Sequence, residues 1–253
     1  MDEFYELGNM AKFLVFDLGE TLLDFNLEGR WHDHLQWEVI PEMIMLVKSD
    51  TSSKHLKNIS EEELRLLFYQ KIAQPPNKLL SMVTRIEDIL TYLSIKPISS
   101  LINRIISVFE RSLQPYVKIY PDVVDSLKFL RKNSNILGLW SNTPWQSPGF
   151  VSRSLMEKFQ IAKYFDYMYF SGDFEVRKPN PKTMEIVLEQ SGQKKEEMAY
   201  IGNSELDIIT GVNFNIPTVW INRNSEQLSP SCPTPTIEIN SLTELPKVIS
   251  LLH

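Results

Sequence analysis

The sequence predicts an α/β protein in which a three-layer, Rossmann-like parallel sheet is interrupted by an inserted, all-helical segment. Residues 12–17 (KFLVFD) form a short apolar run that ends in an acid, as expected for a strand buried on both faces. Residues 28–114 then show apolar residues at spacings of three and four, without a strand-like run. Beyond Pro115, short apolar runs alternate with helical patterns, which is typical of strands joined by crossover helices.

The N-terminal half supplies the first strand and the helical insert. Residues 19–26 are too short and too mixed in character to predict a helix. Within the insert, the periodicity of amphipathic helices occurs in residues 31–47, 60–72, 85–92 and 99–112.

The C-terminal half predicts the rest of the sheet. We expect strands at residues 135–140, 167–171, 198–201, 218–221 and 236–239, and helices at residues 121–132, 148–159, 181–191, 207–213 and 242–252. Residues 1–26 and 115–253 are therefore predicted to form one α/β core domain, and residues 27–114 a helical cap domain inserted into it.

The composition limits the classes of partner. The chain has 253 residues and a net charge of -6, which argues against a nucleic-acid-binding surface because such surfaces carry excess positive charge. Its one cysteine, Cys232, cannot form an internal disulfide, and no apolar run approaches the roughly 18 residues that span a bilayer. The first residues lack the positive start of a signal peptide. We expect a cytoplasmic protein that acts on a small molecule, without nucleic acid or membrane as partner.

Polar residues end three of the predicted strands. Ligands of open α/β sheets bind beyond the carboxyl ends of the strands, so these residues can share one cleft. Lys178, in a loop before a helix, and Asp207, near the start of another helix, can join them. Such a set suits attack by a carboxylate on an electrophile whose charge a lysine and a hydroxyl stabilise. The residues at the strand ends are Asp17, Ser141, Asn142, Asn203 and Ser204.

Each of these residues, taken alone, has a plainer explanation. An Asp or Ser after a strand often caps a turn, and a lysine is usually a solvated surface charge. An Asp in the first turn of a helix is favoured by the helix dipole. The argument for a site therefore depends on the order and placement of the residues.

That order resembles the haloacid dehalogenase-like superfamily of hydrolases over nearly the whole chain. The family's first motif, D-x-D-x-T after a strand, corresponds to residues 17–21 (DLGET). Its second motif, a strand that ends in Ser or Thr, corresponds to residues 141–142 (SN), and its third, a Lys often followed by Pro, to residues 178–179 (KP). Its fourth motif, G-D-S-x-x-D, corresponds to residues 202–207 (GNSELD). The insert lies where the family has its helical cap.

The resemblance implies a catalytic role for five positions. Asp17 is implied to be the nucleophile that forms an aspartyl intermediate. Thr21 and Ser141 are implied to bind the transferred group, and Lys178 to hold both that group and Asp17. Asp207 completes the set.

The resemblance also implies a metal ion and a substrate site. Mg²⁺ is implied to be bound by Asp17, the backbone carbonyl of Gly19 and residue 203, with Asp207 able to coordinate directly or through water. The helical cap is implied to close over the cleft and set specificity. Candidate substrate-binding residues are Asn142, Ser204 and, as the nearest arginine of the cap, Arg30.

Two positions depart from the family's pattern. Gly19 stands where family phosphatases have the Asp that protonates the leaving oxygen and then activates water, and such help is worth about 10²–10⁴ in rate. Asn203 replaces a charged oxygen ligand with a neutral amide, so we expect weakly bound Mg²⁺. The adjacent Glu20 is expected to point away from the place of the missing acid, because successive side chains diverge in an extended segment.

Three functions remain open from the sequence. The first is a Mg²⁺-assisted phosphatase of small phosphorylated metabolites, with weakened acid–base catalysis. The second is a metal-independent 2-haloacid dehalogenase, because halide leaves as an anion and needs no proton. The third is a catalytically silent member that binds a phosphorylated ligand or a protein partner.

Overall fold

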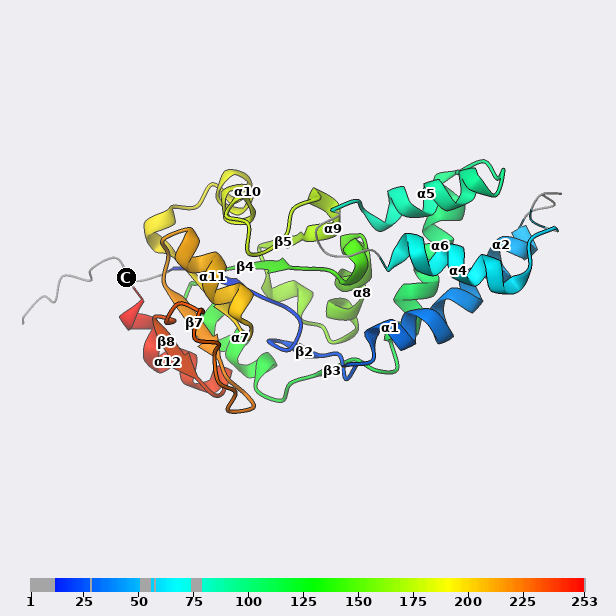
Figure 1. Cartoon of the computed structure of the whole chain (residues 1–253). Helices are drawn as coiled ribbons and strands as arrows, with labels where there is room; N and C mark the ends of the chain where they lie inside the picture. The colour runs from blue at the N-terminus through cyan, green and yellow to red at the C-terminus, as the bar shows by residue number, and fades with distance from the viewer. Residues whose placement is uncertain (1–11, 28, 51–55, 57, 74–78, 253) are drawn as a thin grey trace, which may run out of the picture.

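The computed structural model describes residues 12–27, 29–50, 56, 58–73 and 79–252 of the chain. It confirms the predicted fold class: a six-stranded parallel sheet flanked by helices, with a helical stretch inserted between the first two strands of this sheet along the chain. Figure 1 shows that α1, α2, α4, α5 and α6 gather at one end of the molecule, away from the sheet.

The sheet has the strand order β5-β4-β1-β6-β7-β8, and every neighbouring pair is parallel. β1 lies at its centre because it pairs with both β4 and β6. All residues of β1, β6 and β7 are buried, as their continuous apolar runs predict for strands covered on both faces. The strands are β1 (Phe13–Phe16), β4 (Ile136–Ser141), β5 (Tyr167–Phe170), β6 (Met198–Gly202), β7 (Thr218–Ile221) and β8 (Ile237–Ile239).

Alternate residues of the strands face different helical layers. Leu14 and Phe16 belong to the same hydrophobic cluster as residues of α7, α8 and α12, whereas Phe13 and Val15 cluster with residues of α10. Figure 1 shows α10 and α11 on one side of the sheet and α7 and α12 on the other. The α-helices of this part are α7 (Val123–Lys132), α8 (Gly149–Lys158), α9 (Ser171–Phe174), α10 (Lys182–Ser191), α11 (Glu205–Asn213) and α12 (Leu245–Val248).

The helical stretch begins with α1, which passes into a π-helix and then into α2 without a break. Pro41 lies at this junction and has no N–H for the regular ladder. Ser60 and Ser81 are the N-cap residues of α4 and α5, and their hydroxyls accept backbone N–H bonds, which stabilises helix starts. The elements are α1 (Trp31–Asp33), the π-helix (His34–Val39), α2 (Ile40–Asp50), α4 (Glu61–Ile72), α5 (Met82–Tyr92) and α6 (Ser99–Leu113).

A two-stranded antiparallel ribbon joins the chain segments that enter and leave the helical stretch. β2 (Leu23–Asp24) pairs with β3 (Lys118–Ile119). Neither strand was predicted, because two residues are too few to show a period.

The last segment differs from the single helix expected at residues 242–252. It consists of a 3-10 turn (Leu242–Glu244), α12 and a second 3-10 turn (Ile249–Leu251). Pro246 interrupts the α-helical ladder here, since it donates no backbone hydrogen bond. The other 3-10 turns are Pro144–Gln146, Ala162–Tyr164 and Lys195–Glu197.

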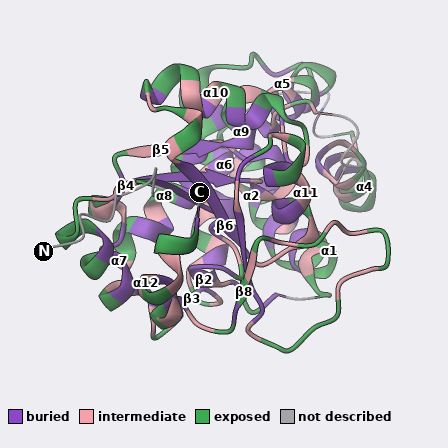
Figure 2. Cartoon of the chain, turned by 90° about the vertical axis from the view of Figure 1, so that its left-hand side faces the viewer, coloured by how far each residue is buried: buried purple, intermediate pink, exposed green. Residues whose placement is uncertain are grey.

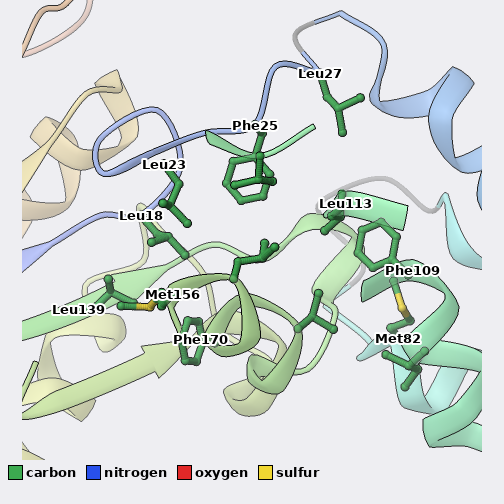
Figure 3. Close-up of a cluster of buried hydrophobic side chains, with 14 of the residues drawn as sticks. Leu18, Leu23, Phe25, Leu27, Met82, Phe109, Leu113, Leu139, Met156 and Phe170 are labelled. Atoms are coloured by element: carbon green, nitrogen blue, oxygen red, sulfur yellow. The ribbon is translucent and has the colours of Figure 1, made fainter. Parts of the chain in front are cut away.

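One hydrophobic cluster connects the helical stretch to the sheet. It includes Phe109 and Leu113 of α6 together with Leu139 of β4 and Phe170 of β5, and Figure 3 shows these side chains within the cluster. Figure 2 shows the central strands as buried, between helices with exposed outer faces. Among the described residues, no helix is long and apolar enough to cross a membrane.

Candidate active site

A cleft of about 270 Å³ opens at the carboxyl ends of β1, β4 and β6. The loop before α10 forms one side of it, and the start of the helical stretch forms another. Its lining includes most of the residues that the sequence singles out. They are Asp17, Gly19, Ser141, Asn142, Lys178, Asn203 and Ser204, joined by Glu20, Phe25, Trp31, Pro144, Ser152, Arg177 and Leu206.

Lys178 lies between two buried carboxylates. Its Nζ is 2.5 Å from Oδ1 of Asp17 and 2.6 Å from Oδ1 of Asp207. These three residues are at most 7% exposed. Residues 161 positions apart in the sequence are therefore in direct contact, because β1 and the loop before α10 meet at the same edge of the sheet.

Burial and charge set the protonation of this group. Burial raises the pKa of Asp17 to about 6, although Lys178 opposes the shift and Asp207 adds to it. Burial alone lowers the pKa of Lys178, but the two carboxylates outweigh it and raise that pKa well above its ordinary value. The lysine is therefore an ammonium ion, and Asp17 is ionised at neutral pH.

Asp207 has both of its carboxylate oxygens engaged. Oδ1 accepts from Lys178, and Oδ2 accepts from the backbone N–H of Ser204 at 2.9 Å and from its hydroxyl at 2.7 Å. The last two bonds stabilise the start of α11, which begins at Glu205, two residues before the predicted start. Asp207 thus fixes Lys178 and the helix, and it does not line the cleft.

Thr21 connects the first and fourth motifs. Its hydroxyl lies 3.3 Å from Oδ2 of Asp17 and 3.1 Å from Oδ1 of Asn203. The backbone carbonyl of Asn203 accepts from Nε1 of Trp220 at 2.8 Å. One carboxylate oxygen and one amide oxygen are therefore held around a single hydroxyl.

Asn142 holds the loop that carries Lys178. Its Nδ2 donates to the carbonyl of Lys178 at 3.2 Å, and its Oδ1 accepts from the N–H of Lys178 at 2.9 Å. The peptide bond between Lys178 and Pro179 is cis. Ser141 lies one residue earlier, at the end of β4, and lines the cleft.

The oxygen atoms around Asp17 can be compared with the ligands that the implied Mg²⁺ needs. Among the described residues, no group of three or more His, Cys, Asp or Glu side chains gathers. Asp17 Oδ2 and Asn203 Oδ1 nevertheless converge on Thr21, and Gly19 lines the same cleft. Mg²⁺ binds through one or two carboxylates together with waters and substrate phosphate oxygens, so this set fits a weak site that a bound phosphate completes.

Two residues lie elsewhere than expected. Arg30 is exposed, and its guanidinium donates to the carbonyl of Asn26 at 2.9 Å; it does not line the cleft. Glu20 does line it, contrary to the expectation. The reason is its φ of 56°, a left-handed conformation, whereas the expectation assumed an extended segment.

Glu20 has fixed partners within the cleft. Its carboxylate accepts from the N–H of Phe25 at 3.2 Å and from the hydroxyl of Tyr120 at 2.9 Å. Phe25, Trp31 and Arg177 also line the cleft without having been predicted as site residues. Arg177 was visible in the sequence as the neighbour of Lys178, but adjacency alone does not indicate where its side chain points.

Curated proteins match parts of the chain. Pyrimidine 5'-nucleotidase YjjG of Escherichia coli (strain K12) is 30% identical over 133 residues, which cover 51% of this chain and 56% of that protein. The phosphoglycolate phosphatase of Salmonella choleraesuis (strain SC-B67) is 31% identical over 105 residues, 41% of this chain and 39% of that protein. The chain thus spans about half the length of the curated relatives it matches, or less.

Solved structures share the fold over nearly the whole chain. A 2-haloacid dehalogenase from Pseudomonas syringae pv. Tomato DC3000 has a TM-score of 0.64 at 19% identity, covering 96% of this chain and 99% of that one. The hydrolase YfnB from Bacillus subtilis, solved bound to magnesium, has a TM-score of 0.60 at 18% identity, covering 95% and 99%.

A family model decides the family. The model of haloacid dehalogenase-like hydrolases matches residues 42–221, well over half of the 253 residues. The match includes the second, third and fourth motifs, and the structure brings the first motif into contact with the third and the fourth. The chain belongs to the family of haloacid dehalogenase-like hydrolases.

Proposed function

We propose that this hydrolase is a phosphatase of small phosphorylated metabolites and that Asp17 is its nucleophile. The contact of Lys178 with both Asp17 and Asp207 supports this most strongly. A buried ammonium beside a carboxylate keeps the nucleophile ionised and offers positive charge to a phosphoryl group. Curated relatives named as a nucleotidase and a phosphatase support the same choice.

The proposed reaction has two steps. Lys178 holds Oδ1 of Asp17 at 2.5 Å, whereas Thr21 lies 3.3 Å from Oδ2, so the attack on phosphorus is assigned to the less tightly held Oδ2. A bond from Asp17 to phosphorus forms as the bond from phosphorus to the leaving oxygen breaks. Water then attacks the phosphorus of the aspartyl phosphate and releases inorganic phosphate and the free carboxylate. Thr21 and Ser141 donate to the phosphoryl oxygens in both steps.

Gly19 determines which esters react well. It has no side chain to protonate the leaving oxygen, so esters with acidic leaving groups are expected to react faster than alkyl esters. Mg²⁺, when bound by Asp17, Asn203 and the carbonyl of Gly19, supplies positive charge that neutralises the phosphoryl oxygens.

Residues 27–114 act in this proposal as a cap over the cleft. Trp31, at the start of α1, already lines it. A cap of this kind excludes water and sets specificity.

A substrate panel tests the proposal. We expect slow hydrolysis of p-nitrophenyl phosphate with Mg²⁺, much slower hydrolysis of alkyl phosphates, and loss of both with EDTA. Asp17→Asn is expected to abolish hydrolysis, since an amide is a poor nucleophile. Absence of hydrolysis by the folded wild-type chain would contradict the phosphatase and favour the catalytically silent alternative.

Gly19→Asp tests the missing acid. A Cβ at residue 19 would lie 3.4 Å from the ring of Phe25, an ordinary contact, so we expect the variant to fold. Turnover of alkyl phosphates should rise by about 10²-fold, with a smaller gain on p-nitrophenyl phosphate. A folded variant that gains nothing, or a wild type that hydrolyses both esters equally fast, would refute this explanation.

Dehalogenation is a second candidate, favoured by the neutral Asn203 and by Gly19. Halide leaves as an anion, so this chemistry needs neither a general acid nor a metal. Chloride release from 2-chloropropionate in the presence of EDTA would support it, and no release under those conditions would exclude it.

A further inference from the structure

Arg177 is a cation of the cleft that the proposed chemistry does not use. It lines the cleft with Pro144 and Ser152 and is half-buried. In the part of the chain that the structure describes, its guanidinium makes no ion pair and no hydrogen bond. Arg223, on the loop after β7, is by contrast paired with Asp122 at 2.9 Å.

The surroundings of Arg177 add positive charge. Arg85 of α5 is 2% exposed, and its guanidinium donates to the carbonyls of Ile72 and Trp145. Burial and, to a smaller extent, the charge of Arg177 lower the pKa of Arg85. A guanidinium that is partly withdrawn from water and has no carboxylate partner among the described residues, as at Arg177, favours an anion beside it.

The carboxylates of the cleft are already engaged. Asp17 is paired with Lys178 at 2.5 Å, and Glu20 accepts from Phe25 and Tyr120. Neither is paired with Arg177. The group of Asp17, Lys178 and Asp207 has one ammonium for two carboxylates, whereas Arg177 is a cation without a carboxylate partner among the described residues.

We propose that Arg177 binds a carboxylate on the leaving-group part of the substrate, so that the substrate is a small phosphate ester with a second anionic group. This inference rests on the proposed function for the position of the phosphate. A planar guanidinium matches a carboxylate with two parallel hydrogen bonds. A cleft of about 270 Å³ is slightly smaller than typical ligand pockets, which favours a compact ester.

Two esters that differ by one carboxylate test the proposal. Phenyl phosphate and 4-carboxyphenyl phosphate have similar leaving groups, and the wild type is expected to prefer the carboxylated ester by about tenfold in kcat/KM. Arg177→Gln should remove this preference by acting mainly on the carboxylated ester, whereas Arg177→Lys should keep part of it. Arg153→Gln removes an equal charge from an exposed position on α8 and should leave the preference unchanged.

A binding experiment tests the Arg177 site independently of the proposed phosphatase activity. The affinities of both esters are measured by calorimetry in Asp17→Asn and in the double variant with Arg177→Gln. If Asp17→Asn binds the carboxylated ester more tightly and the double variant does not, the result supports the site, even without turnover. Equal affinities, or a preference that survives Arg177→Gln, would overturn it, whereas failure of the wild type to hydrolyse any ester would count against the phosphatase alone.

Discussion

Lys178 decides the charge balance at the bottom of the cleft, because its ammonium is the common partner of two buried carboxylates. The attraction between the buried charges offsets the cost of taking them out of water. Removal of one charge leaves its partner buried and uncompensated, which destabilises the protein more than breaking an exposed ion pair does. Lys178 thus contributes both to stability and to the ionisation of Asp17.

Lys178→Met is expected to lower the free energy of unfolding by about 3–5 kcal/mol and to abolish hydrolysis of p-nitrophenyl phosphate. Both carboxylates then lie buried without their cation. Urea unfolding and a kinetic assay measure the two effects. Lys182→Met removes a lysine from an exposed position of α10 and serves as control; equal effects of the two variants would contradict the assignment.

The pKa of Asp17 predicts how activity depends on pH. Burial raises this pKa to about 6, and only the ionised carboxylate attacks. We therefore expect kcat/KM for p-nitrophenyl phosphate to be level above pH 6 and to fall about tenfold per pH unit below it. Circular dichroism over the same range checks that the chain stays folded. A level profile down to pH 5 in folded protein would show that Asp17 is not the titrating nucleophile.

At the scale of elements, the start of α11 links helix stability to the site. The hydroxyl and N–H of Ser204 both donate to Oδ2 of Asp207, and Oδ1 of the same carboxylate holds Lys178. The turn before α11 therefore orients Asp207 toward the cation.

Ser204→Ala is expected to cost about 1 kcal/mol of stability, since one of the two bonds to Asp207 is lost. We also expect a lower kcat on p-nitrophenyl phosphate, because Asp207 is held less firmly against Lys178. Ser49→Ala, the same change on an exposed position of α2, is the control. An unchanged kcat in Ser204→Ala would separate the capping of α11 from the function of the site.

At the scale of the whole molecule, one hydrophobic cluster extends from the helical stretch to one face of the sheet. The cluster that contains Leu139 of β4 also contains Phe109 and Leu113 of α6, and Figure 3 shows them as parts of one group. Elements that share buried apolar contacts are expected to unfold together.

Thermal unfolding should therefore give one transition, at the same temperature by circular dichroism and by tryptophan fluorescence. Phe109 is fully buried, so Phe109→Ala is expected to lower the free energy of unfolding by about 3–5 kcal/mol. The transition temperatures measured by the two probes should fall together. Phe129→Ala makes the same change where the side chain is 46% exposed and should cost far less. Two separate transitions would show that the helical stretch unfolds independently of the sheet.

The sequence by itself determined the architecture and the order of the site residues. Apolar runs such as residues 13–16 and 198–202 are readable because burial on both faces demands continuous hydrophobicity. Asp17, Ser141 and Asn203 follow such runs, and parallel strands bring their carboxyl ends to one edge. The sequence did not predict the ribbon of β2 and β3, because strands of two residues show no period and their pairing depends on the packing of distant segments. It also did not predict the interruption of the C-terminal helix, because the effect of a proline on a helix depends on its surroundings.

Only the tertiary structure decided which side chains touch and which remain without a partner. Glu20 enters the cleft because its backbone is left-handed, and Arg30 stays outside because its guanidinium binds Asn26. Asp207 is fully engaged by Ser204 and Lys178, which the motif alone does not disclose. The physical reason is that sequence periodicity reports which face of an element is buried, whereas contacts depend on how elements distant along the chain pack together.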